Sequence, residues 1–135
     1  MIPLPNDELD EDEVRAQLDG WMDELAGGNR LLRLEYPLEI MIGAGGKKAE
    51  PMEFDTLEFR RPKAAILDIA TGKGAQMAIV REMISSMLVP VLDGVKIMPR
   101  HLENLDLIDF TRASLTMGLF FPRPPKAAAL ETGET

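Results

Sequence analysis

The chain has 135 residues, 45% of them hydrophobic, and a formal net charge of −8. This length predicts one domain with a short segment at each end, large enough to bury a core without a disulfide or a metal. Cysteine is absent, which excludes disulfides and thiolate metal sites and favours a reducing compartment. The acidity argues against nucleic acid as a partner, because phosphate binding needs concentrated lysine and arginine.

Membrane insertion is not expected, because no apolar run approaches the ~20 residues that a spanning helix needs. The first residues also have the wrong order for a signal peptide, since acids follow directly after an apolar start. We therefore expect a cytoplasmic protein that has no contact with a membrane.

An acidic N-terminal segment, residues 1–29, is predicted to contain a flexible leader and one amphipathic helix over residues 9–26. The apolar residues of this helix recur with a period of 3.6, and the acids at its start complement the helix dipole. The apolar stripe consists of Val14, Leu18, Met22 and Leu25. Two glycines at positions 27 and 28 are expected to end the helix.

Two strands are predicted next, at about residues 31–42 and 52–60, joined as an antiparallel hairpin. In the first strand, apolar residues alternate strictly and predict one buried face: Leu32, Leu34, Tyr36, Leu38, Ile40 and Ile42. Pro37 has no N–H to donate, which indicates an edge position or a bulge. The apolar face of the second strand changes partway along, which predicts a bulge or a break in register near Asp55.

Helical periodicity follows the hairpin. We expect a short helix that begins at Pro62, a longer helix over residues 75–89, and a third helix from Asp106 to about Phe120. Asp106 is predicted to cap the third helix by accepting the N–H of Asp109. The residues expected to point inward are Ile108, Ala113 (or Arg112), Leu115 and Leu119.

The predicted fold class is therefore α+β, with a small antiparallel hairpin packed against a C-terminal bundle of three to four helices. The main domain is expected over residues 30–121, and residues 122–135 are expected to form a flexible tail rich in proline and alanine.

Catalytic chemistry is not indicated. His101 is the only histidine, which rules out a multi-histidine metal site. Ser85, Ser86 and Ser114 fall within predicted helices and lack a nucleophile-elbow motif. The glycine and lysine loop at residues 43–48 lacks the spacing of a phosphate-binding loop. We expect neither a catalytic site nor a cofactor, so the chain is predicted not to be an enzyme.

Methionine is abundant, with nine residues against one tryptophan and one tyrosine. Methionine side chains adapt to partners of different shape, but they also fill irregular space in cores. The apolar stripe of the two long helices is the candidate partner-binding surface, and ordinary core packing is the alternative for the same residues. The stripe consists of Met77, Val80, Met83, Met87, Leu115, Leu119 and Phe120.

Three short motifs occur in order along the chain. The first is Leu-x-x-Pro at Leu34 and Pro37, the second runs from Leu57 to Pro62, and the third is Leu-Asp-x-x-Asp-Phe at residues 105–110. The set resembles the tail assembly chaperone family of Mu-like and other contractile-tailed phages and prophages. The N-terminal helix is longer than the family pattern, and Ala64 stands where the family more often has a small polar residue.

This resemblance implies a chaperone that binds the tape measure protein, a long helical chain, and keeps it soluble while the tail tube assembles. It also implies self-association and a longer form made by ribosomal frameshifting near residues 120–126. A structural tail-associated subunit and a small acidic regulatory interaction module are the alternatives. A basic cluster at Arg60, Arg61 and Lys63 is more typical of a solvated rim than of a phosphate site.

Overall fold

The computed structural model describes residues 10–42, 48–90 and 95–121. A three-stranded antiparallel sheet has the order β1-β2-β3, so that β2 pairs with both neighbours. The strands are β1 (Met22–Glu24), β2 (Arg30–Ile42) and β3 (Glu50–Phe59). The predicted antiparallel hairpin of β2 and β3 is therefore confirmed, as is the α+β class. The predicted leader, the tip of the hairpin and the C-terminal tail lie outside the described residues.

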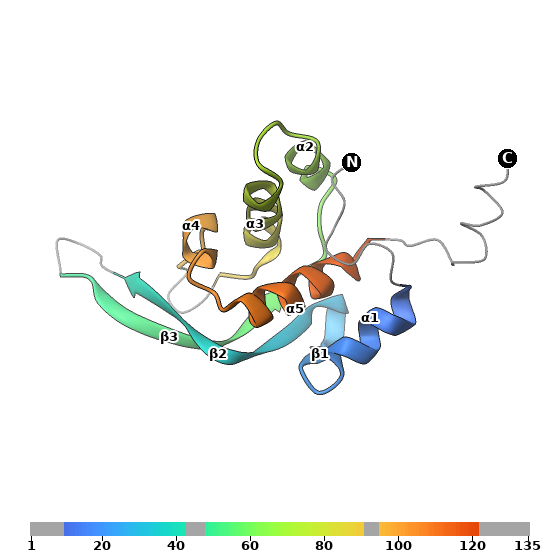
Figure 1. Cartoon of the computed structure of the whole chain (residues 1–135), viewed down its shortest axis with the longest axis horizontal. Helices are drawn as coiled ribbons and strands as arrows, with labels where there is room; N and C mark the ends of the chain where they lie inside the picture. Colours follow the sequence, from blue (N-terminus) through green and yellow to red (C-terminus); the bar gives the residue numbers. More distant parts are fainter. Residues whose placement is uncertain (1–9, 43–47, 91–94, 122–135) are drawn as a thin grey trace, which may run out of the picture.

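Helices α2 to α5 lie on one side of the sheet (Figure 1), where α5 lies between the sheet and α3. Helices α2 and α4 each pack beside α3, and α1 packs against α5. The helices are α1 (Glu11–Leu18), α2 (Ile66–Ala70), α3 (Gln76–Met87), α4 (Pro99–Leu102) and α5 (Leu107–Gly118). The core fills the space between the sheet, α3 and α5, as the burial of Phe59, Ile84 and Leu115 illustrates.

The N-terminal helix is shorter than predicted, because α1 ends at Leu18 and the chain then turns at Gly20, whose φ is +83°. Residues 22–24 form β1, and Met22 pairs with Leu32 of β2. The predicted helix over residues 9–26 is therefore wrong after Leu18. Hydrogen bonds to β2 hold this segment extended, although its apolar spacing continues that of α1.

A bulge interrupts the β2–β3 pairing, as the sequence predicted. Arg33 pairs with Thr56 and Leu38 pairs with Phe54, so residues 34–37 stand opposite Asp55 alone. Pro37 lies in this bulge, where its missing N–H breaks no ladder bond. The bulge turns Tyr36 outward to 52% exposure, so the predicted strict alternation is wrong at this residue.

The end of β3 is tied to the end of α3. The N–H of Arg60 donates to the carbonyl of Met87 at 2.8 Å, and the N–H of Val89 donates to the carbonyl of Glu58 at 2.9 Å. Pro62 lies in the following connection and not at the start of a helix, because α2 begins at Ile66. This connection brings the first turn of α2 beside the last turn of α3.

Candidate functional site

Most of the predicted binding stripe lies in the core. The buried members are Val80, Met83, Met87, Leu115 and Leu119, each at most 6% exposed. They are buried because α3 and α5 pack on each other and α5 packs on β2. Almost none of their surface is open to a partner while the domain stays folded, so their burial favours the alternative of ordinary core packing for this stripe.

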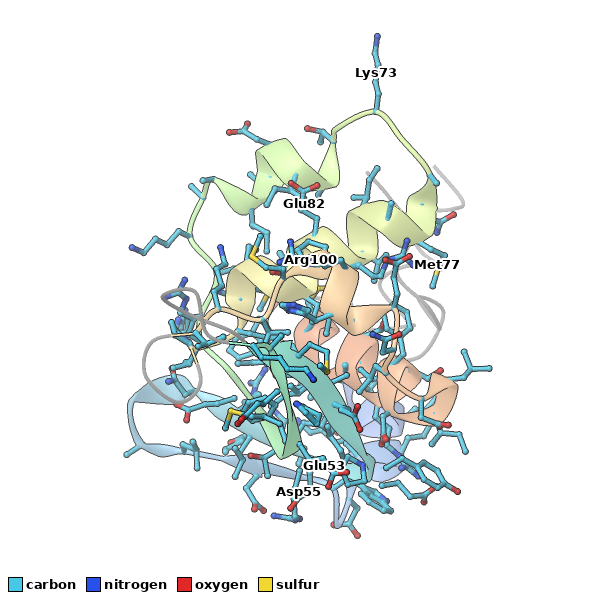
Figure 2. The ribbon with its side chains drawn as sticks, turned by 90° about the vertical axis from the view of Figure 1, so that its left-hand side faces the viewer. Glu53, Asp55, Lys73, Met77, Glu82 and Arg100 are labelled. Carbon is cyan, nitrogen blue, oxygen red and sulfur yellow. The ribbon has the colours of Figure 1, made fainter. Side chains whose placement is uncertain are left out.

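The other two members lie nearer the surface. Met77 is 44% exposed in the first turn of α3 and lies at the outer edge of that helix (Figure 2). Phe120 is half-buried, and the guanidinium carbon of Arg30 lies 4.4 Å from the centroid of its ring. Met77 lies in the first turn of α3, whereas Phe120 follows the end of α5.

An exposed apolar pair begins α5. Leu107 is 75% exposed and Ile108 is 46% exposed, which corrects the prediction that Ile108 points inward. Asp106 caps the helix by accepting the N–H of Ile108 at 2.9 Å, and not that of Asp109 as predicted. The cap fixes the helical phase so that Phe110 and Ala113 face the core, which leaves the first two side chains outside.

A shallow hollow of about 410 Å³ adjoins this pair. We call it the α5 hollow, and its lining consists of Gln17, Leu107, Ile108, Thr111, Arg112 and Leu115. Gln17 comes from α1 and the other residues come from α5, so the hollow follows the line where these two helices pack. Its size suits a few side chains of another protein, and its apolar members favour an apolar occupant.

A buried carboxylate supports the same end of α5. Asp109 is fully buried, and its two oxygens accept the backbone N–H groups of Glu35 at 2.8 Å and Tyr36 at 2.9 Å. Both N–H groups belong to the bulge of β2, where the strand ladder is interrupted. Asp109 therefore replaces the missing ladder partners and fixes α5 against the sheet.

Arg112 connects the hollow to this support. Its Nη1 lies 3.7 Å from the Glu35 carboxylate and 3.8 Å from the Asp109 carboxylate. Its guanidinium carbon also lies 4.0 Å from the centroid of the Trp21 ring, a cation–π contact. One wall of the α5 hollow is therefore held by contacts within α5 and to two other segments, at Trp21 and at Glu35.

His101 has a structural role. Its Nδ1 accepts the N–H of Met98 at 2.9 Å, which closes the first turn of α4. Burial and, to a lesser degree, the positive charge of Arg100 lower the pKa of His101 from its ordinary value, which favours the neutral ring that this hydrogen bond requires. The side chain also borders an open hollow of about 590 Å³ beside Met41 of the hairpin.

Sequence reasoning missed the roles of Leu107 and Asp109, and it gave Arg112 only as an alternative to Ala113 among the inward residues. Helical spacing in the sequence did hold a signal for Leu107 and Asp109. Asp109 shares a helical face with Ala113 and Thr116, both of which are buried. Phasing α5 on that face turns Leu107 and Ile108 outward. Arg112 gave no such signal, because its neighbours Trp21 and Glu35 are far away in the sequence.

The part of the chain that the structure describes contains neither a candidate metal site nor a candidate membrane-spanning helix. No group of three or more histidine, aspartate or glutamate side chains there could hold a metal ion. Among the same residues, every helix is too short or too polar to cross a bilayer. Protein family models, curated proteins and solved structures were compared with the chain, and none matches it.

Proposed function

We propose that this chain is a protein-binding module that acts as a tail assembly chaperone for a tape measure protein in the cytoplasm of the host cell. The observation that carries the binding role is the adjacent exposed pair Leu107 and Ile108 beside the α5 hollow. Singly exposed apolar residues are normal on protein surfaces, whereas an adjacent pair with a hollow next to it is typical of a contact site.

The three motifs that carry the family resemblance support the proposal because they meet in the fold. Asp109 of the third motif accepts the N–H groups of Glu35 and Tyr36 of the first motif. Leu57 of the second motif pairs with Leu32, next to the first motif on β2. Segments that are more than 70 residues apart thus form one structural unit.

The expected contact is physically simple. A tape measure helix without its tube would expose apolar side chains, and these can pack on the α5 pair and into the hollow. The contact is small, so coating of one long partner requires several copies that bind weakly and sum by avidity. Self-association and the longer frameshifted form belong to the same proposal, and the tail in which the two forms would diverge lies outside the described residues.

Co-expression with the tape measure protein from the same gene cluster tests the proposal, with the soluble fraction of that protein as the readout. The test variant is Leu107→Asp with Ile108→Asp, which should leave the fold intact because acids are favourable in the first turn of a helix. The matched control is Leu67→Asp, since Leu67 is 51% exposed in the first turn of α2.

The wild type and the control are expected to keep the tape measure protein soluble, and the double variant is expected to lose this activity. Equal activity of all three proteins would remove the α5 pair from the proposal. A wild type that fails to solubilise the tape measure protein would refute the chaperone role itself. If the protein is found in purified phage particles, a role as a structural tail subunit is favoured.

A further inference from the structure

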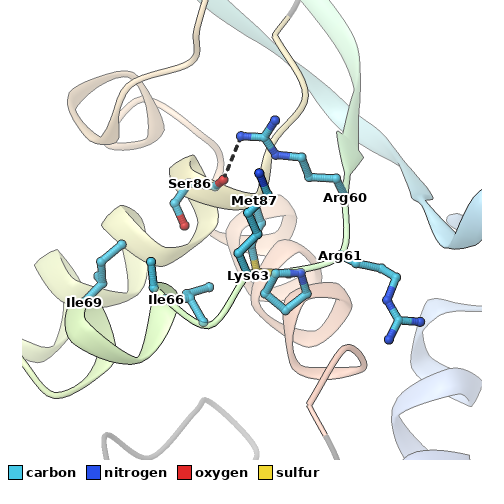
Figure 3. A pocket seen from close by; sticks show the side chains of 9 residues that line it. Arg60, Arg61, Lys63, Ile66, Ile69, Ser86 and Met87 are labelled. Carbon is cyan, nitrogen blue, oxygen red and sulfur yellow. Dashed lines mark hydrogen bonds between the residues drawn. The ribbon is translucent and has the colours of Figure 1, made fainter.

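A small basic pocket lies where the connection after β3 passes the last turn of α3 (Figure 3). Its volume is about 180 Å³. Three cationic side chains and an apolar surface line it: Arg60, Arg61 and Lys63 with Ile66, Ile69 and Met87. Its lining includes neither aspartate nor glutamate. A chain with a net charge of −8 thus carries a pocket that three cationic residues line together, with no acidic residue among them.

The three cations differ in how they are held. Arg60 donates from Nη2 to the carbonyl of Ser86 at 3.4 Å, and Figure 3 shows it turned towards the end of α3. Arg61 points away from the other labelled side chains in the same view. Arg61 and Lys63 are exposed, and they make no side-chain hydrogen bond or ion pair with any other described residue. Within the part of the chain that the structure describes, both positive charges therefore lack an acidic partner and can meet the carboxylates of a ligand.

The apolar part of the pocket sets the size of the ligand. Pockets for cofactors and drug-sized molecules usually have volumes of about 300–1,000 Å³, and this pocket is smaller. Ile66 and Met87 belong to the core and contribute a firm apolar wall, and half-buried Ile69 completes it. The space suits one apolar side chain, with charged groups on either side of it.

We propose that this pocket binds an acidic peptide segment that carries a single apolar anchor residue. The carboxylates pair with Lys63 and with the outward-turned Arg61 at the rim, where arginine offers a bidentate fork, and the anchor contacts Ile69 and Pro62. Charge complementarity selects an acidic partner, and the negative charge of the remaining chain disfavours a nucleic acid. This site is separate from the α5 hollow and does not depend on the chaperone role.

A synthetic probe tests the proposal directly. The probe is a fluorescein-labelled peptide of eight glutamates with one central leucine, and the comparison peptide has serine in place of that leucine. Binding is measured by fluorescence anisotropy and located by amide shifts in ¹⁵N-labelled protein. The test variant is Lys63→Glu. Its matched control is Lys73→Glu, because Lys73 projects into solvent from the α2–α3 loop and does not line the pocket (Figure 2).

The leucine peptide is expected to shift the amides of residues 60–66 and 86–87. Lys63→Glu is expected to weaken binding about tenfold, and Lys73→Glu less than about twofold, because only the first charge contacts the ligand. The serine peptide should bind several times more weakly than the leucine peptide. Circular dichroism of both variants establishes that each remains folded.

Several results would overturn the proposal. If Lys63→Glu and Lys73→Glu weaken binding of the leucine peptide equally, the effect comes from the net charge of the protein and not from the pocket. If the serine peptide binds as tightly as the leucine peptide, no apolar anchor is involved. Amide shifts confined to α5 would place the peptide at the α5 hollow instead of this pocket. Tighter binding of an oligothymidine than of the leucine peptide, or a dimer that Lys63→Glu dissociates, would assign the pocket to a nucleic acid or to a second copy of the chain.

Discussion

Replacing Asp109 with alanine is expected to destabilise the domain by about 3–5 kcal/mol. The carboxylate accepts two backbone N–H groups at 2.8 and 2.9 Å, and a hydrogen bond to a charged group contributes about 1.5–3 kcal/mol. Alanine leaves both donors without a partner in an interrupted part of the ladder. Water can reach the exposed bulge, so the loss falls short of the upper limit of about 6 kcal/mol for two such bonds.

Urea unfolding measures this loss. Trp21 is the only tryptophan, and its ring lies against Arg112 near the substituted residue, so its fluorescence reports on the same region. Circular dichroism followed in parallel establishes whether the transition is two-state. With a slope of about 2 kcal/mol per molar urea, the midpoint is expected to fall by about 1.5–2.5 M.

The matched control is Asp106→Ala, three residues earlier at the start of the same helix. Asp106 is exposed and its carboxylate accepts the single N–H of Ile108, so the loss of this side chain is expected to cost about 1 kcal/mol. Asp109→Asn should fall between the wild type and alanine, because the amide retains one acceptor oxygen. An Asp109→Ala variant no less stable than Asp106→Ala would refute the view that the buried carboxylate holds the bulge to α5.

Two further substitutions test other parts of the fold. Met83→Asp is expected to unfold the domain, because burying a carboxylate without a partner costs several kcal/mol and the total stability of a domain is only about 5–15 kcal/mol. Met77→Asp, in contrast, should stay within about 0.5 kcal/mol of the wild type in thermal unfolding. A folded Met83→Asp protein would revive the open-groove hypothesis. For His101, the lowered pKa means that the unfolded state binds more protons just below its ordinary pKa. Stability should therefore fall as the pH drops through this window. His101→Gln should remove that part of the dependence, and identical pH profiles would contradict it.

The parts of the fold that local pattern dictates were predictable. Alternation marked β2, a helical period marked α3 and α5, and Pro37 together with the change of face at Asp55 marked the bulge. Each of these signals arises within one element or between adjacent strands. They required no knowledge of which distant segments meet.

The errors arise where tertiary contacts decide. Residues 22–24 continue the apolar spacing of α1, but pairing with β2 makes them a strand, and only Gly20 hinted at the break. Likewise, the apolar stripe of α3 has the same period whether it faces its own sheet or a partner. Periodicity gives the direction of a helical face and not its occupant, so the sequence left the role of Met83 open.

The exposed apolar surface of the helices comes from residues at the beginning of a helix. The exposed large apolar residues of the described helices, namely Leu67, Met77, Leu107 and Ile108, all lie at the first or second position of their helix. First-turn side chains point outward when only the later turns pack on neighbours. Such exposure is therefore partly a consequence of packing geometry and does not by itself indicate binding. The α5 pair differs because its members are adjacent and border a hollow braced by Arg112. This difference is the reason that Leu67→Asp is the decisive control for the chaperone proposal.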